Sequence, residues 1–305
     1  MPLLPFRSRF DLTFPRYLGV LWLGCLLGSA VLSLGQTAPD DASGATDPLA
    51  AITPRDSSDF GADERDSTLR PTGPWAPRPI TNWAFGVGES LSYSIGWEKI
   101  VAGRGEMIVG NVVDTLGRLC YPVLSTVRST PFFSAFYKVD DRVSTLMDAR
   151  ELFPLRFEKH LSEGRYRQNR RVEFDPELGV ALTSADTFAV PPYVLDDLSL
   201  LYYVRTLAMT PGRDIELDIY SGKKLYRLTV RVIRRERIAV AAGTFSTIVV
   251  EPLLQAAGLF KHEGKVTVWL TDDRLHLPVL MKSKVVVGSI IAELEEYRLG
   301  QIRQY

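Results

Sequence analysis

The stretch KVTVWLTDDRLHLPVLMKSKVVVGSIIAELEEYRL, residues 265–299, decides the fold class of this chain of 305 residues. Its first part, residues 266–270 (VTVWL), alternates apolar and polar side chains as a half-buried strand does. Turn-forming residues follow at 271–274 (TDDR), and an apolar return segment runs from 278 to 287 before Gly288 interrupts it. We therefore predict the closing β-hairpin of an all-β domain, and nothing in the stretch specifies a reaction or a ligand.

The same period of two recurs upstream of this hairpin. In residues 89–97 (ESLSYSIGW) the apolar side chains fall on one face and the serines on the other, and segments 215–220 and 226–232 alternate in the same way. Residues 100–105 (IVAGRG) contain two glycines and are predicted to form a bend. With roughly a dozen short strands separated by turn signals, the chain is predicted to be mainly β, a curved antiparallel sheet of half-barrel or barrel-like form.

One segment has the features of an α-helix. Asp196 or Asp197 can cap it, and residues 210–212 (TPG) end it. Between these limits one stripe of residues recurs at helical spacing: Leu198, Leu201, Tyr202 and Arg205. A single amphipathic helix among strands must bury its stripe, so we expect this helix to plug or cover the concave face of the sheet.

The N-terminal 35 residues are typical of a secretory signal peptide. Three arginines precede an apolar run at 17–34, and small residues at Ser33 and Gly35 indicate cleavage near Gly35–Gln36. An uncleaved membrane anchor is the alternative interpretation. Acylation at Cys25, as in a lipoprotein, is disfavoured because the apolar run continues past the cysteine.

The rest of the chain divides into a linker and a domain. Residues 36–82 are rich in Pro, Ser, Asp, Ala, Thr and Gly and cannot bury enough apolar surface to fold, so we expect a disordered tether. Residues 83–301 form the predicted β-rich domain. The expected location is outside the cytoplasm, in the periplasm or associated with the outer envelope.

Charge and cysteine content narrow the class of partner. The chain has 36 Lys+Arg and 36 Asp+Glu, so its overall charge gives no reason to expect nucleic acid or an anionic membrane as the default partner. Once the signal segment is removed Cys120 stands alone, so we expect no internal disulfide and a buried thiol that packs as a small apolar side chain.

Motifs that carry chemistry are missing from the sequence. The three histidines are far apart and lack metal-ligand spacing, and no nucleophile elbow, phosphate-binding loop or dinucleotide fingerprint is present. We therefore expect no metal, no cofactor and no enzymatic activity. A hydrolase that uses Asp140 or Asp141 remains an alternative, since this acidic pair lies within a predicted strand and has Arg142 or Lys159 as a conceivable partner.

Aromatic residues supply the candidate ligand site. Residues 131–137 (PFFSAFY) are the densest aromatic cluster, which could be core, the lining of a cavity or a surface dipping into lipid. Five residues are the candidates for the lining of a cavity: Trp97, Phe132, Phe133, Phe136 and Tyr202. Together with export and a single covering helix, they favour a protein that binds an apolar or amphipathic, lipid-like ligand.

A row of cations supplies the second candidate site. In a strand, Arg165, Arg167 and Arg171 would share one face and could meet an anionic partner. This face favours a structural or assembly factor that contacts envelope proteins or polymers. A solvated face that opposes acidic residues of a neighbouring strand is the alternative.

Short motifs in a fixed order carry a family resemblance over residues 83–299. They are FGVGESLSY at 85–93, LSLLYYVR at 198–205, GTF at 243–245, TD at 271–272, PVLMK at 278–282 and GSI at 288–290. In these motifs the chain resembles a family of exported bacterial proteins classified as a domain of unknown function. The resemblance implies an envelope location and no established activity. More distantly, a curved sheet covered by a helix is similar to the half-barrels of lipoprotein carriers, which hold acyl chains in their concavity.

Overall fold

The computed structural model describes residues 77–305 apart from 98–99, 116, 257–258, 261–265 and 285–287. The expected signal peptide and most of the expected linker lie outside these residues. In the described part all sixteen strands belong to one sheet, and every pair of neighbouring strands is antiparallel. The strands are β1 (Ser90–Trp97), β2 (Ile100–Val109), β3 (Val113–Thr115), β4 (Arg118–Ser129), β5 (Asp140–Asp148), β6 (Pro154–Glu163), β7 (Tyr166–Asp175), β8 (Val180–Leu182), β9 (Thr187–Ala189), β10 (Asp214–Ser221), β11 (Lys224–Val240), β12 (Gly243–Ala256), β13 (Leu259–Phe260), β14 (Val266–Thr271), β15 (Pro278–Lys284) and β16 (Ser289–Arg298); the helices are α3 (Pro131–Ser134) and α4 (Ser199–Arg205).

The closing hairpin predicted from residues 265–299 is confirmed. It forms β14 and β15, and β16 continues the sheet to β1, so the first and last strands of the domain pair with each other. The order across the sheet is β10-β11-β12-β14-β15-β16-β1-β2-β4-β5-β6-β7-β8-β9, with β13 beside β12 and β3 beside β4. The predicted mainly β, curved antiparallel architecture is therefore the observed one.

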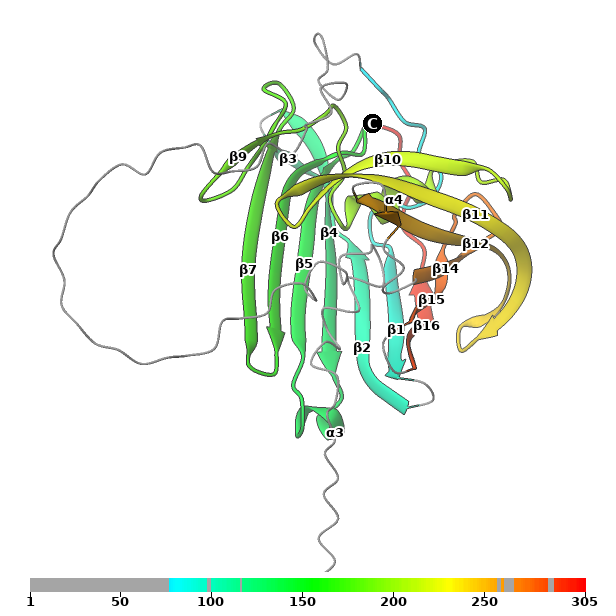
Figure 1. The fold of residues 1–305 in the computed structure, drawn as a ribbon. Helices are drawn as coiled ribbons and strands as arrows, with labels where there is room; N and C mark the ends of the chain where they lie inside the picture. The colour runs from blue at the N-terminus through cyan, green and yellow to red at the C-terminus, as the bar shows by residue number, and fades with distance from the viewer. Residues whose placement is uncertain (1–76, 98–99, 116, 257–258, 261–265, 285–287) are drawn as a thin grey trace, which may run out of the picture.

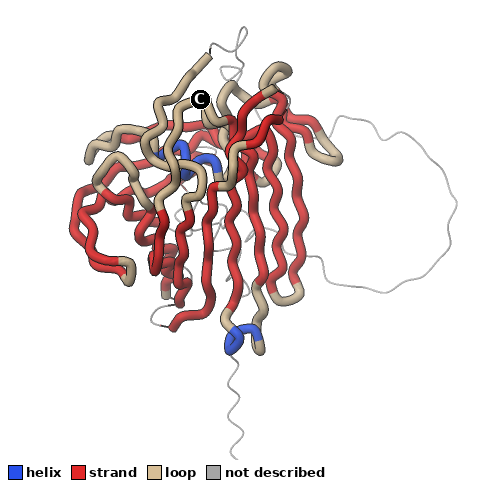
Figure 2. Tube along the Cα trace, turned by 180° about the vertical axis from the view of Figure 1, so that it is seen from behind, coloured by secondary structure: helices blue, strands red, loops and turns tan. Residues whose placement is uncertain are grey.

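The sheet curls into a barrel-like shape (Figure 1). Its end strands, β9 and β10, do not pair with each other. Instead, the segment before α4 pairs with the free edge of β10. The Leu195 N–H donates to the Asp218 carbonyl (3.0 Å), and the Tyr220 N–H donates to the Leu195 carbonyl (2.8 Å). Seen from behind, the long strands stand side by side and α4 lies behind them (Figure 2).

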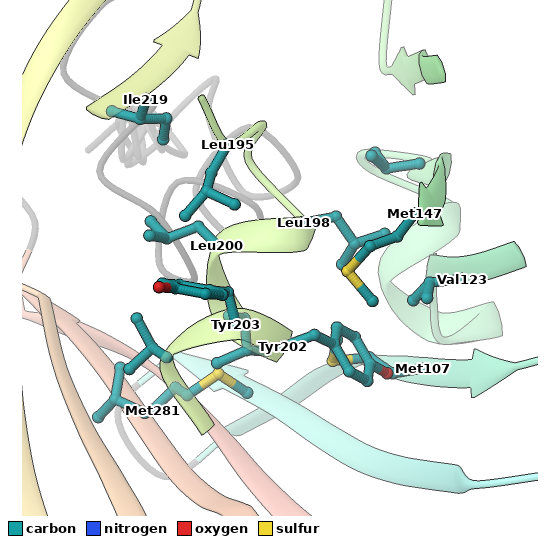
Figure 3. Packing of buried hydrophobic residues seen from close by; sticks show 14 of the residues in the cluster. Met107, Val123, Met147, Leu195, Leu198, Leu200, Tyr202, Tyr203, Ile219 and Met281 are labelled. Atoms are coloured by element: carbon teal, nitrogen blue, oxygen red, sulfur yellow. The ribbon is translucent and has the colours of Figure 1, made fainter. Parts of the chain in front are cut away.

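Helix α4 lies against the concave side of the curved sheet, as the sequence predicts. All seven of its residues are buried. Figure 3 shows its leucines and tyrosines among side chains from several strands, including Met107 of β2 and Met281 of β15. The helix begins after Asp196, whose Oδ1 accepts the N–H groups of Leu198 and Ser199. It is shorter than the sequence suggests and ends at Arg205, five residues before the predicted stop.

The prediction of a bend at residues 100–105 is wrong. These residues belong to β2, and the irregularity is a register shift between Ile95 and Gly96 of β1. Gly103 serves close packing instead, because a Cβ there would lie 2.8 Å from the carbonyl oxygen of Arg128 on β4.

Two further findings concern the described residues. None of their helices has the length and apolar character needed to cross a membrane. Cys120 is free and buried, and burial raises the pKa of its thiol to about 12.

Candidate functional site

The aromatic candidates separate into two groups at different places in the fold. Phe132 and Phe136 are 70% and 71% exposed on and just after α3, at the end of the barrel where β4 leads into β5, while Phe133 turns inward. Trp97, the last residue of β1, is partly buried against the core. Tyr202 lies on α4, remote from α3 in Figure 1, and is fully buried. The five residues therefore do not line one common surface.

Tyr202 is held between the helix and the start of the domain. Its ring meets Phe85 edge to face with centroids 4.8 Å apart, and Phe85 in turn meets Tyr121 at 5.4 Å. Figure 3 shows the Tyr202 ring reaching toward Met107.

The arginine candidates lie on and beside β7. Arg165 is in the turn that precedes the strand, while Arg167 and Arg171 are exposed on its outer face. Arg171 forms ion pairs with Glu158 (3.2 Å) and Glu173 (2.6 Å). For this residue the alternative interpretation of the sequence applies, a solvated strand face that opposes acidic residues.

Arg167 donates to the carbonyls of Gly164 and Tyr166 at the same turn. No contact of the Arg165 side chain is found among the described residues, so the three cations have different surroundings.

The acidic pair at 140 and 141 splits between the two faces of β5. Asp140 is exposed and pairs with Arg128 at 3.1 Å. Asp141 points inward, is 3% exposed, and accepts the Ser162 N–H at 2.8 Å through Oδ1. The alternation of a strand thus sends one carboxylate of the pair into the barrel.

Inside the barrel, Asp141 belongs to a group that we call the interior polar cluster. It consists of Asp141, Lys159, Glu163, Asp197 and Tyr226. The register of β5 and β6 places Lys159 and Glu163 diagonally on either side of Asp141. Lys159 Nζ lies 3.8 Å from Asp197 Oδ2, which connects the wall of the barrel to the segment that leads into α4.

The electrostatics of the cluster centre on two carboxyl groups. Burial, and after it the Asp141 carboxyl alongside, raise the pKa of Glu163 to about 9. Burial also raises the pKa of Asp141, although the hydrogen bond from the Ser162 N–H acts in the opposite direction. Two carboxyl groups can hydrogen-bond to each other only when one is protonated, so we infer that this pair shares a proton at neutral pH.

Several buried polar atoms of this interior have no hydrogen-bond partner among the described residues. Apart from the proton that Glu163 and Asp141 share, both Glu163 oxygens, Asp141 Oδ2 and Asp197 Oδ1 have no hydrogen-bond donor among the described residues. Five buried hydroxyl groups also have no hydrogen-bond partner among the described residues: those of Ser125, Tyr202, Tyr220, Tyr226 and Ser283. Unpaired buried polar groups are uncommon in native proteins and cost about 1–3 kcal/mol each. A concentration of them marks a place where a ligand or water would complete the hydrogen bonding.

A second buried ion pair joins α4 to the start of the sheet. Arg205, fully buried, donates to both carboxylate oxygens of Glu89 at 2.7 and 2.8 Å and to the carbonyls of Ala84 (2.8 Å) and Leu275 (3.2 Å). Its guanidinium also lies 5.2 Å from the Tyr202 ring centroid. With its donors engaged on all three nitrogens, this arginine anchors the helix and is not available to a ligand.

Sequence reasoning did not identify Glu163 or Tyr226. A signal for Glu163 exists, since it shares the strand face of Phe157 and Leu161, where an apolar residue is expected. Tyr226 gives no such signal, because an inward tyrosine is common in a core.

The described residues contain no group of His, Cys, Asp and Glu that could hold a metal ion.

Three solved structures are similar to this chain to different degrees. A β-barrel-like protein of domain of unknown function DUF1849 from Brucella abortus matches with a TM-score of 0.52 and 12% sequence identity, over 72% of this chain and 100% of that chain. A protein with a YmcC-like fold from Bacteroides fragilis matches with a TM-score of 0.34 and 11% identity, over 72% and 100%. A hypothetical protein from Chlamydia trachomatis matches with a TM-score of 0.33 and 9% identity, over 72% and 90%. At 12% identity, the Brucella structure shows a shared fold alone.

A family model described as "Protein of unknown function (DUF3108)" matches residues 92–295. No curated protein matches the sequence.

Proposed function

The chain belongs to the DUF3108 family of proteins of unknown function, and we propose that it is an exported, non-catalytic protein of the cell envelope that binds an amphipathic, lipid-like ligand inside its curved sheet. The N-terminal segment with the pattern of a signal peptide supports export. The proposed polar contact of the ligand is the interior polar cluster, and its proposed apolar contact is the surrounding wall of the barrel.

The observation that carries the proposal is the state of Glu163. This side chain is 1% exposed, and apart from the proton that it shares with Asp141 neither of its oxygens has a hydrogen-bond donor among the described residues. Asp141 and Asp197 contribute further acceptors without donors. A ligand whose polar group donates hydrogen bonds, such as a hydroxyl or an ammonium group, fits a cluster of this kind.

Apolar residues surround the cluster on the same inward face. The register places Ser125, Val143 and Lys159 in one row across β4, β5 and β6. Val127 and Leu161 flank Asp141 in the next row, and both are buried. Polar atoms set within an otherwise apolar wall are what a site for an amphipathic molecule requires.

Native mass spectrometry of protein purified from cells without detergent tests the proposal. We expect a bound mass that organic solvent releases and that lipid mass spectrometry identifies. The variant Glu163→Leu should lose this mass and yet remain folded, because an apolar side chain of similar size replaces a buried carboxyl and only the Asp141 carboxyl loses a hydrogen-bond partner.

Glu173→Leu is the matched control, since Glu173 is a partly exposed glutamate on the neighbouring strand β7. It should keep the bound mass. A wild-type protein of bare mass after incubation with a lipid extract, or a Glu163→Leu protein that retains the ligand fully, would contradict the proposal.

A further inference from the structure

Four exposed apolar residues gather at one end of the barrel, and we call them the apolar tip. They are Ile100 (53% exposed), Val101 (51%), Phe132 (70%) and Phe136 (71%). The first two start β2, and the last two lie on or next to α3. The Thr130 N–H donates to the Ala102 carbonyl at 2.9 Å, which holds these two segments together. Figures 1 and 2 show α3 projecting at the end of the barrel.

The fold holds the tip in an ordered conformation. Phe133 turns inward and its N–H reaches the Thr130 hydroxyl, while the Ser134 N–H donates to the Thr130 carbonyl at 2.8 Å. Phe132 and Phe136 consequently point away from the core and contact each other edge to face, with ring centroids 5.7 Å apart. Little conformational entropy remains to be lost when such side chains bind a surface.

Cations surround the tip. Lys138 follows α3, and its carbonyl accepts the Gly164 N–H at 2.7 Å, which brings the turn with Arg165 alongside. Both side chains are exposed, as is Lys284 at the end of β15. Among the described residues at this end, Asp140 is paired with Arg128 and Glu163 is buried, so neither carboxylate is free to balance these cations.

We propose that the apolar tip docks onto an anionic lipid bilayer. Aromatic and aliphatic side chains flanked by Lys and Arg are the composition that binds the interface of a membrane, since the apolar groups enter the headgroup region and the cations meet lipid phosphates. Other exposed apolar side chains, such as Leu178 and Leu299, occur singly and carry no such meaning. This surface is independent of the ligand proposed for the interior.

A fluorophore placed at the tip tests the proposal in the full chain. Ala135 is exposed between the two phenylalanines and can be replaced by cysteine for labelling with the environment-sensitive dye NBD, in a chain that also carries Cys25→Ser and Cys120→Ser. Ala185→Cys, in the exposed turn between β8 and β9, is the matched control. Because the dye reports its own surroundings, membrane attachment through another part of the chain does not produce the signal at position 135.

With vesicles that contain phosphatidylglycerol, the dye at position 135 should shift to the blue and brighten about threefold, as expected on entering the interface. The dye at position 185 should not change. Vesicles of phosphatidylcholine alone, or high salt, should weaken the response because cation attraction to the surface is screened.

Two variants connect the signal to the side chains. Phe132→Ser with Phe136→Ser should lower the vesicle affinity about tenfold or more, while Leu178→Ser should not. Lys138→Glu with Arg165→Glu should lower it about thirtyfold or more, and Arg213→Glu, an exposed cation on the turn before β10, is its control. Circular dichroism should show each variant folded, as expected for exposed positions.

An equal response at positions 135 and 185, or an unchanged response after the double phenylalanine substitution, would overturn the proposal. A wild-type protein that dimerises through the tip and ignores the vesicles would do so as well.

Discussion

Arg205 heads the fully buried side chains in the described part of the chain by volume, and Glu89 neutralises it. The two residues are far apart in the sequence, one on α4 and the other in the segment just before β1. Burying two charges costs more than their attraction returns unless the geometry and the remaining hydrogen bonds are good. Here the contact is bidentate and two carbonyls accept the remaining bonds, so the pair fixes where the helix sits.

Removal of either partner should therefore be far more harmful than removal of both. We expect Arg205→Met and Glu89→Leu each to lower the free energy of unfolding by about 3–5 kcal/mol, since each leaves a buried charge uncompensated. The double variant Glu89→Leu with Arg205→Met should be less destabilised than the sum of the two. Urea denaturation of all four proteins measures the coupling, and additive effects would show that the two charges do not act as a pair.

Glu163 should make stability depend on pH. Its pKa is about 9 in the folded chain, above the ordinary value of 4.5, so between these pH values the folded state holds a proton that the unfolded state has released. Stability from this group is complete below pH 4.5 and is lost as the pH rises toward 9. Asp141 and Lys159 face the Glu163 carboxyl, and their charges also affect how stability changes with pH.

The prediction is that wild-type protein loses more stability than Glu163→Gln between pH 5 and pH 9, because glutamine cannot release a proton. Thermal unfolding followed across that range gives the difference between the two proteins. Parallel curves would mean that Glu163 does not titrate in this way.

At the scale of elements, two glycines allow the two ends of the domain to meet. Gly86 precedes β1 and Gly300 follows β16, and a Cβ at either position would collide with backbone of the other segment. The Val87 N–H donates to the Gln301 carbonyl at 3.2 Å, and the Gln301 N–H donates to the Val87 carbonyl at 2.8 Å. The pairing of β1 with β16 thus extends beyond the strands themselves.

Gly86→Ala should consequently destabilise the domain by more than Gly117→Ala. Gly117 lies in the turn between β3 and β4 with a φ of 79° and open space around it, so alanine there costs only the strain of the left-handed conformation, about 1–2 kcal/mol. At Gly86 the backbone segments must move apart. Chemical denaturation of the two variants compares them, and equal losses would contradict close packing at this joint.

The buried helix α4 also belongs to this scale. With seven residues, α4 is too short to be stable alone in water, so its packing and its contacts at both ends must hold it. At the start, Asp196 accepts two backbone N–H groups and the Thr145 hydroxyl. At the end, Arg205 forms the ion pair with Glu89.

At the scale of the whole molecule, stability should fall from the middle of the sheet to its ends. Strands β16, β1 and β2 have neighbours on both sides and carry buried residues, whereas β8 and β9 are three residues long and end the sheet. Hydrogen exchange followed by mass spectrometry should find the slowest amides in β1, β2 and β16 and the fastest among these strands in β8 and β9. Uniform protection across the sheet would contradict this gradient.

The sequence by itself determined the mainly β class, the position of the closing hairpin, the burial of α4 and its apolar stripe, since these depend on local periodicity and on turn and cap chemistry. It also marked Asp141 as the member of an acidic pair that turn chemistry does not explain. The tertiary structure alone decided that Glu163 and Asp141 share one place, that Arg205 reaches Glu89, and that Phe132 and Phe136 face outward. The reason is physical: these relations depend on strand register and on pairing between residues far apart in the chain, and a periodic pattern gives the face of a residue without giving its neighbour.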